Sequence, residues 1–354
     1  MWPQNTAFSP ELPTLQLYWD STSLGLLKEC ARKYELAIVR GWRSRSAAVD
    51  LDFGIFLHSA RERYYHARAA GAGHDNAQRA GLDWLLSATW NEQLNRPWQG
   101  DQFKNRFTLA RTYVWYCEQW GARPDPLEQV MLANGRPAVE VSFRFELAYG
   151  PGKRAEDKCA NCGATGFEQS KLGPFRCEFC DGTEGGNPPA REEWQEGPKY
   201  SLCGHLDRLV CFNGGLWVSD LKSTKHTLDA SYFQQFSPDN QMSLYSLAGQ
   251  VVCGERTSGI IIDAAQVAVG FSRFARGLVQ RTEAQLEEWL RGLEVLLRQA
   301  EQYARANFWP QNDKACFRCQ FRPICGKTPH VREQWLKADY ERRTWDPLQV
   351  RGDI

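Results

Sequence analysis

The chain has 354 residues, of which 42% are hydrophobic and 24% are charged, with a net charge of +1. This is the composition of a soluble globular protein with room for a large core. A net charge near zero predicts no overall electrostatic attraction to nucleic acid. An enzyme that acts on nucleic acid, however, needs only a basic groove and not an excess of basic residues over the whole chain. No apolar run reaches the roughly 18–20 residues of a membrane span, and no signal-peptide pattern opens the chain. We therefore expect a cytoplasmic protein.

The first 135 residues are expected to be mainly helical. Residues 1–20 are rich in proline and aromatic residues and are expected to form a surface arm. A helix should begin near Ser21 or Ser23, since serine is a good N-cap residue. The helical region then extends over residues 21–135. Its aromatic side chains are expected to fill the core of a helical subdomain; they are Trp84, Trp90, Phe107, Tyr113, Trp115 and Trp120.

Strands and helices alternate in the region 136–270. Residues 137–147 alternate apolar and polar side chains, which predicts a half-buried strand with Glu140 on its polar side. Further strands are predicted at 201–212, 215–221 and 259–269, a helix at 239–252 and a long amphipathic helix at 282–307. The order helix-β-β-β-α-β predicts an α/β fold with a mixed sheet. Residues 271–330 then form a C-terminal helix with a cysteine cluster, and 331–354 a tail.

Two of the predicted strands each carry an acid in an apolar context. Asp207 follows Gly204 in the first, and the second ends in Asp220-Leu221-Lys222. Gln241 and Tyr245 share one face of the next helix. A single Asp-x-Lys at a strand end is usually a solvated turn, so the ordered set carries the argument. Two carboxylates that hold a hard cation, beside a lysine that positions water, are what metal-assisted phosphodiester hydrolysis needs.

The motifs GHLDR, DLK and Q-x-x-x-Y, in this order, resemble the PD-(D/E)XK nuclease superfamily and in particular its RecB-like branch. The segment from Phe53 to His58 is similar to the F-G-x-x-x-H motif of that branch, whose histidine ligates the metal. The resemblance implies a restriction-endonuclease-like core. It also implies that Mg²⁺ or Mn²⁺ is held by four groups: His58, Asp207, Asp220 and the Leu221 carbonyl.

The resemblance also gives roles to the neighbouring residues. Lys222 is expected to orient or activate the hydrolytic water, and Gln241 to hold the catalytic strand or a ligand water. Tyr245 is expected to hold the phosphate or Lys222. Glu140 matches an accessory acid that touches a second metal or orients Lys222, although an exposed strand glutamate is an equally good interpretation.

Three cysteines cluster near the C-terminus, at Cys316, Cys319 and Cys325. The segment around Cys30 resembles the entry helix of RecB-like nucleases that carry an iron–sulfur cluster, with Ala31 in place of the usual proline. The resemblance implies that Cys30 and the three C-terminal cysteines hold one [4Fe-4S] cluster. The alternatives are a zinc ion on the same thiolates, or Cys30 as a core cysteine.

Four further cysteines form two CxxC pairs, Cys159/Cys162 and Cys177/Cys180. This spacing is typical of a zinc ribbon, in which short turns bring four thiolates to a tetrahedral Zn²⁺. The ribbon lies at 155–185 and would interrupt the nuclease core as an insertion. A structural zinc is the default interpretation, and a contact with DNA or a protein partner is the alternative.

The sequence therefore predicts a metal-dependent DNA nuclease, most simply an exonuclease that prefers single strands. One or two aromatic residues of the helical subdomain could stack on bases. The rival interpretations are a non-catalytic DNA-binding or assembly module on a nuclease fold, and an iron–sulfur redox protein. The chain has no G-x4-G-K-[ST] phosphate loop, so a helicase motor would come from a recombination or CRISPR-type partner.

Overall fold

The computed structural model describes residues 7–44, 49–151, 167–170, 173–176, 198–317 and 319–348, with only the backbone described at 167–170 and 173–176. The α-helices are α1 Ser21–Glu29, α2 Ala31–Tyr34, α3 Val49–Ala69, α4 His74–Ala88, α5 Arg106–Gly121, α6 Ala230–Gln234, α7 Asn240–Cys253, α8 Glu283–Arg305, α9 Arg322–Cys325 and α10 Arg332–Asp339. A π-helical turn at Glu35–Val39 follows α2, and 3-10 turns lie at Asp313–Cys316 and Pro329–Val331.

The strands of the main sheet are β1 Tyr18–Trp19, β5 Glu128–Gln129, β6 Val139–Glu146, β9 Ser201–Phe212, β10 Gly215–Thr224, β11 Gly259–Val267 and β12 Ser272–Val279. Short two-stranded ribbons are formed by β2 Trp42–Ser44 with β13 Tyr340–Arg342, β3 Trp90–Asn91 with β4 Arg96–Pro97, and β7 Phe167–Ser170 with β8 Gly173–Arg176.

The main sheet is mixed. Strand β9 pairs with β10 and the short β1 along one edge and with β5 and β6 along the other. Beyond β10, the sheet continues through β11 to β12. The β9–β10 pair is antiparallel, whereas β10 and β11 run parallel. The predicted α/β fold with the order αβββαβ is confirmed, and β10 extends three residues beyond its predicted end, to Thr224.

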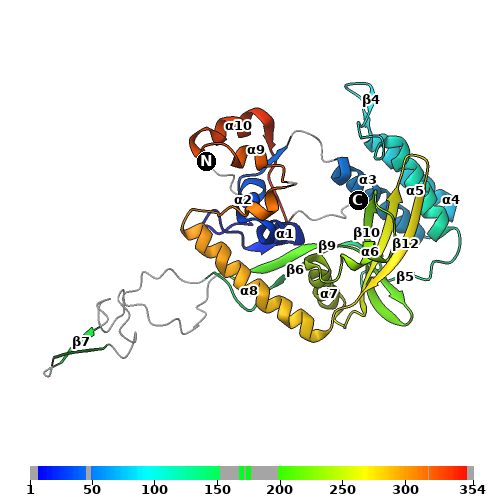
Figure 1. Cartoon of the computed structure of the whole chain (residues 1–354). Helices are drawn as coiled ribbons and strands as arrows, with labels where there is room; N and C mark the ends of the chain where they lie inside the picture. The colour runs from blue at the N-terminus through cyan, green and yellow to red at the C-terminus, as the bar shows by residue number, and fades with distance from the viewer. Residues whose placement is uncertain are drawn as a thin grey trace.

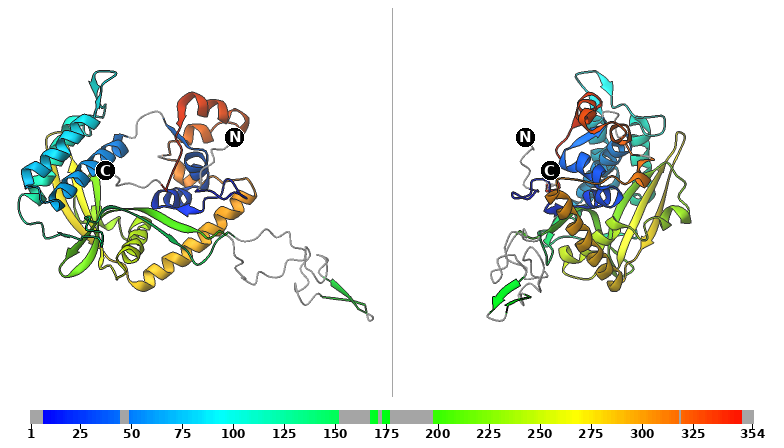
Figure 2. Two further views of the ribbon diagram at one scale, coloured as in Figure 1. Left: turned by 180° about the vertical axis from the view of Figure 1, so that it is seen from behind. Right: turned by 60° about the vertical axis from the view of Figure 1, so that its left-hand side comes forward.

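Helices cover both faces of the sheet, with a separate apolar cluster on each (Figures 1 and 2). Side chains of α1, α7 and α8 pack with Leu206 and Ile262 on one face. Side chains of α3, α4 and α5 pack with Leu221 and Val267 on the other. Figure 1 shows α3–α5 gathered at one end of the sheet, whereas α1 and α2 lie with α9 and α10 at the other end.

The two chain ends differ from expectation. The predicted surface arm at 1–20 contributes core residues, since Leu15 and Trp19 are fully buried and β1 pairs with β9. The segment 331–354, predicted to be a tail, carries α10 and β13 instead, and β13 pairs with β2. Both segments are held by residues far away in the sequence, which local patterns do not reveal.

Helix α1 begins at Ser21, as predicted, but its N-cap is Asp20. The Asp20 side chain accepts from the Ser23 backbone N–H at 2.9 Å, and Ser23 Oγ accepts from the Asp20 backbone N–H at 3.2 Å. This is a capping box, in which the predicted N-cap Ser23 serves as the third helical residue. Over the part of the chain that the structure describes, no helix is both long and apolar enough to cross a membrane.

Candidate active site

The two candidate acids meet where β9 and β10 separate. The two strands are paired up to Ser219 and Arg208, and Asp220 and Asp207 are the next residues on each. Beyond this fork β10 pairs only with β11, while β9 continues along β6. Asp207 Oδ2 accepts a 2.7 Å hydrogen bond from the backbone N–H of Leu221. The fork thus places two buried carboxylates on facing strands without a ladder hydrogen bond between them.

Helix α3 brings His58 to the same point. Its Nδ1 lies 3.2 Å from Asp207 Oδ2 and 3.5 Å from Glu140 Oε1. Its Nε2 lies 3.2 Å from the Leu221 carbonyl oxygen. That carbonyl, predicted to be a metal ligand, thus faces the far side of the imidazole. A hydrogen bond from Nε2–H to a backbone carbonyl leaves Nδ1 free to ligate, which is the usual way a ligating histidine is oriented.

Glu140 has an unusual backbone. Its φ of 48° lies in the left-handed region, although it is a non-glycine residue within strand β6. This conformation costs of order 1–3 kcal/mol in a non-glycine residue and is found mainly at functional sites. It accompanies a side chain that is buried against His58, so the alternative of an exposed strand glutamate does not fit.

Lys222 belongs to a chain of polar contacts that leads to α7. Its Nζ lies 2.7 Å from Asp220 Oδ2 and donates to Gln241 Oε1 at 2.7 Å. Gln241 Nε2 in turn donates to the Tyr245 hydroxyl at 2.9 Å. Gln241 therefore touches Lys222 directly, whereas Tyr245 reaches it through Gln241.

The buried charges shift one another's protonation. Burial raises the pKa of Asp220 to about 6, with Lys222 opposing and Asp207 adding to the shift. Burial also acts on Asp207, but the charges of His58 and Arg61 and the Leu221 N–H hold the pKa of Asp207 below its ordinary value. Burial disfavours protonated His58, yet the two neighbouring carboxylates raise the pKa of His58 to about 10.

These groups fit a hard divalent cation. His58, Glu140 and Asp207 offer ligand atoms that lie within 4.8 Å of one another. Asp220 is buried beside them, and its Oδ2 lies 2.7 Å from Lys222 Nζ. Carboxylate oxygens with one imidazole suit Mn²⁺, and Mg²⁺ binds through carboxylates.

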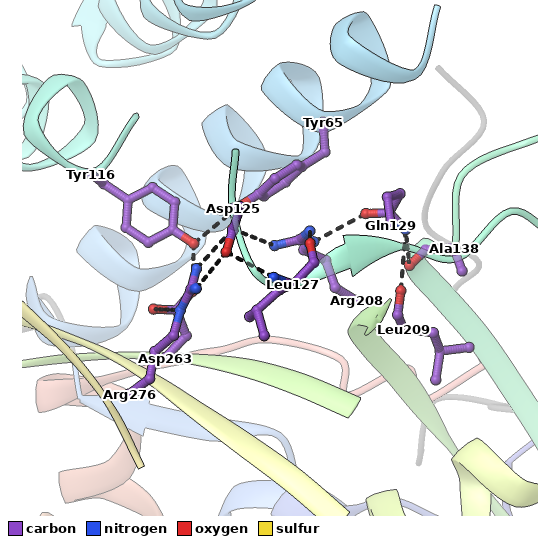
Figure 3. Close-up of polar contacts among 10 residues, drawn as sticks. All are labelled: Tyr65, Tyr116, Asp125, Leu127, Gln129, Ala138, Arg208, Leu209, Asp263 and Arg276. Atoms are coloured by element: carbon purple, nitrogen blue, oxygen red, sulfur yellow. Dashed lines mark hydrogen bonds and ion pairs between the residues drawn. The ribbon is translucent and has the colours of Figure 1, made fainter. Parts of the chain in front are cut away.

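A buried ion-pair network supports the site from the α3 side of the sheet (Figure 3). The Arg208 guanidinium lies 3.6 Å from the Tyr65 ring centroid and donates to Gln129 Oε1. Arg276 forms two hydrogen bonds with Asp125, at 2.6 and 2.9 Å. Arg208, the arginine of GHLDR, directly follows Asp207 in β9. Its contacts with Tyr65 and Gln129 thus fix β9 next to Asp207. The sequence reasoning gave these partners no role, because their contacts join distant segments.

Arg61 is another residue that the motifs did not mark. It lies one helical turn after His58 and is 3% exposed. Its guanidinium lies between the Tyr65 and Tyr116 rings, and its Nε and Nη1 make no hydrogen bond. Its charge helps to keep the pKa of Asp207 low. The neighbouring acids thus have a buried counter-charge.

The four cysteines assigned to one cluster lie around a single cavity, whose lining includes Cys30, Cys316, Cys319 and Cys325. Asn312 ties the two ends of the chain here, because its backbone N–H lies 3.3 Å from Cys30 Sγ and its side chain donates to the Glu29 carbonyl. Among the described residues, no three of these sulfur atoms lie within 4.8 Å of one another. The cysteines of the predicted ribbon, Cys159, Cys162, Cys177 and Cys180, lie outside the described residues.

A histidine–carboxylate group that could hold a metal, with an adjacent lysine at a fork in a mixed sheet, is what a metal-dependent nuclease needs. The chain belongs to the PD-(D/E)XK nuclease superfamily, whose family model matches residues 21–326. A nuclease of this superfamily implies DNA as the substrate.

Comparison with individual proteins adds little. No curated protein matches the chain. A solved structure named "Putative exonuclease" from Eubacterium rectale is similar to it, with 13% sequence identity, a TM-score of 0.47, and coverage of 93% of this chain and 96% of that one. The assignment rests on the family match and on the site geometry.

Proposed function

We propose that the protein is a RecB-like exonuclease that releases nucleotides or short oligonucleotides from single-stranded DNA ends. The observation that carries this is the convergence of His58, Glu140 and Asp207, from three separate elements, beside the buried Asp220 and its partner Lys222. A decayed nuclease fold that only binds DNA would have no reason to retain this set. An iron–sulfur redox protein would not need it.

His58, Glu140, Asp207 and Asp220 are the ligand set in this proposal. The bound Mg²⁺ or Mn²⁺ supplies Lewis-acid stabilisation of the phosphate charge and an acidified water. The Leu221 backbone serves as a scaffold, because its N–H fixes Asp207 and its carbonyl fixes His58. Lys222 orients the attacking water with its ammonium group. Gln241 holds Lys222, and Tyr245 holds Gln241.

The proposal includes a [4Fe-4S] cluster in the cavity lined by Cys30, Cys316, Cys319 and Cys325. Support comes from the four cysteines lining one cavity and from the likeness of the Cys30 segment to the entry helix of cluster-bearing nucleases. A single zinc ion on the same thiolates is the alternative. Such a cluster would join the entry segment to the C-terminal segment, with a structural role.

A zinc ion on the two CxxC pairs completes the proposed cofactors. It is supported by the spacing of the four cysteines alone. Metal analysis of the full chain should find about one zinc, which Cys177→Ser releases and Cys211→Ser retains. A zinc content that is the same in both variants would contradict the ribbon.

The experiment that tests the nuclease function uses end-labelled single- and double-stranded DNA, linear and circular, with Mn²⁺. We expect digestion of linear single strands, little digestion of circles and no digestion in EDTA. Equal cutting of circles would replace the exonuclease with an endonuclease. Binding without cleavage in any metal would favour the non-catalytic DNA-binding module.

A further inference from the structure

Helix α5 carries a stripe of aromatic and arginine side chains on its exposed face. Phe107, Arg111 and Trp115 are each four residues apart, so they follow one another at about 6 Å along the helix. Phe107 is 74% exposed and Trp115 42% exposed, whereas both were expected in the core of the helical subdomain. The core face of α5 is formed instead by residues such as Leu109 and Tyr113. An exposed aromatic stripe of this kind indicates a contact surface.

The turn between β11 and β12 extends this stripe. Arg111 donates to the carbonyl oxygens of Val269 and Phe271 at 2.6 and 2.9 Å, and its guanidinium lies 5.5 Å from the Trp115 ring centroid. Phe271 is 37% exposed, and the Arg273 guanidinium lies 4.6 Å from its ring centroid. A shallow groove runs between the two elements; its lining is Trp115, Glu118, Gln119, Ser272, Arg273 and Phe274.

The charge of this surface is positive. Arg111 and Arg273 both stack against aromatic rings, with Arg111 held in place by the turn. The groove also holds one acid, Glu118, which accepts from the Gln78 amide at 2.9 Å and lies 3.4 Å from His74 Nε2, so two arginines stand against one carboxylate. Aromatic faces interleaved with arginine are the make-up of surfaces that bind single-stranded nucleic acid, where bases stack and phosphates pair with cations.

The surface begins at the end of β10, directly after the candidate site residues of that strand. Helix α5 begins two residues after Lys104, whose Nζ lies 3.2 Å from Ser223 Oγ. Ser223 directly follows Lys222 in β10. On the other side, Gln266, near the end of β11, pairs with Thr224 of β10, and the turn that holds Phe271 comes next. Both parts of the surface thus begin at the end of the strand that carries Asp220 and Lys222.

We propose that these five residues, Phe107, Arg111, Trp115, Phe271 and Arg273, form a stacking platform for the single-stranded nucleic acid that leads to the active site. Phe107, Trp115 and Phe271 stack on bases, Arg273 pairs with phosphate, and Arg111 fixes the platform. The proposal rests on the proposed nuclease function and adds where the substrate strand lies.

The test measures binding in EDTA, so that cleavage does not interfere. The probe is a fluorescent oligo-dT of about 30 nucleotides, compared with an abasic strand of the same length. Phe107→Ala and Trp115→Ala should each weaken oligo-dT binding about tenfold, and leave binding of the abasic strand nearly unchanged. The matched control is Trp335→Ala, because Trp335 on α10 is 43% exposed and lies outside the platform. Thermal melts check that each variant is folded.

The outcomes separate this proposal from the proposed function. Platform variants that bind oligo-dT as the wild type does, or an equal loss in Trp335→Ala, would overturn the platform even if the enzyme cleaves DNA. A wild-type protein that binds oligo-dT through the platform but never cleaves DNA would support the platform and contradict the proposed nuclease function. A change of oligomeric state in Trp115→Ala, with binding unchanged, would assign the surface to a second copy of the chain.

Discussion

The backbone N–H of Leu221 donates a 2.7 Å hydrogen bond to Oδ2 of Asp207. Leu221 lies between Asp220 and Lys222 in β10, whereas Asp207 lies in β9. The backbone of β10 therefore fixes the acid of β9 at the point where the two strands separate. The relative position of the two acids therefore follows from the sheet itself, which is the kind of rigid support that a catalytic group needs.

Replacing either strand acid should abolish metal-dependent cleavage. Asp220→Asn keeps the shape of the side chain but removes the charge that a divalent cation needs, so we expect turnover to fall by on the order of 10³ or more. Steady-state cleavage with Mn²⁺ measures this. Asp83→Asn, at an exposed position on α4, is the control and should be unaffected. Near-normal turnover of Asp220→Asn would remove Asp220 from the ligand set.

Replacing Glu140 tests whether its left-handed backbone conformation serves metal binding. Its φ of 48° suits glycine, so Glu140→Gly should relieve about 1 kcal/mol of backbone strain and also remove a buried carboxylate from beside Asp207. We expect the variant to bind Mn²⁺ more weakly, and the loss of the Glu140–His58 pairing to offset the relief of strain in the melting temperature in EDTA. Calorimetry of both properties checks this. Unchanged Mn²⁺ affinity would show that Glu140 does not ligate the metal.

The strand acids and Lys222 could be predicted from the sequence because they interrupt apolar strands, where charge is costly. The position of Glu140 could be predicted as well, but its backbone conformation could not, because nothing in residues 137–147 marks a left-handed residue. The N-terminal arm was misjudged for a related reason. Trp19 is buried where β1 pairs with β9, some 180 residues away in the sequence, and a local sequence pattern cannot predict that pairing.

The aromatic residues of α5 show a different limit. Phe107, Tyr113 and Trp115 have the same apolar character in the sequence, yet Tyr113 is fully buried and Phe107 is 74% exposed. Periodicity alone could not decide which face of α5 meets the sheet, because large aromatic side chains occur on both faces. The neighbouring strand β12 and helix α4 settle it through packing.

The pKa of His58 predicts proton release on metal binding. Its pKa of about 10 means that metal-free protein holds His58 protonated at neutral pH. The stabilisation that the metal-free protein gains from the His58–Asp207 pair is full below pH 6.5, the ordinary pKa of histidine. It is lost as the pH rises through 10. Because only the neutral imidazole ligates, Mn²⁺ binding should release about one proton and strengthen about tenfold per pH unit from roughly 7 to 9.

Calorimetry in buffers of different ionisation enthalpy counts these protons. His58→Asn should release none, and it serves as the control for protons lost elsewhere. Below about pH 6 the dependence should steepen, because Asp220, with its pKa near 6, must also lose a proton. Wild-type binding without proton release would place the metal away from His58.

The cysteine cavity predicts a link between the two ends of the chain. If one [4Fe-4S] cluster joins them, Cys30→Ser should lose as much iron as Cys319→Ser, from about four irons per chain in the anaerobically purified protein. Iron and sulfide analysis measures this, and Cys211→Ser, at an exposed position, is the control. Cys30→Ser protein with its full iron content would require another fourth ligand.

The contacts of α7 predict unequal roles for Gln241 and Tyr245. Gln241 Oε1 accepts directly from Lys222 Nζ. The Tyr245 hydroxyl accepts from Gln241 Nε2 and reaches Lys222 only through Gln241. Gln241→Ala should free the lysine ammonium to turn toward Asp220 alone and lower kcat by about 10–100-fold, with Mn²⁺ affinity little changed. Tyr245→Phe removes one hydrogen bond behind Gln241 and keeps the ring that packs against Phe143, so kcat should fall by less than about tenfold. Single-turnover cleavage with saturating Mn²⁺ separates these effects from metal binding. A larger loss in Tyr245→Phe than in Gln241→Ala would instead place the tyrosine hydroxyl on the phosphate itself.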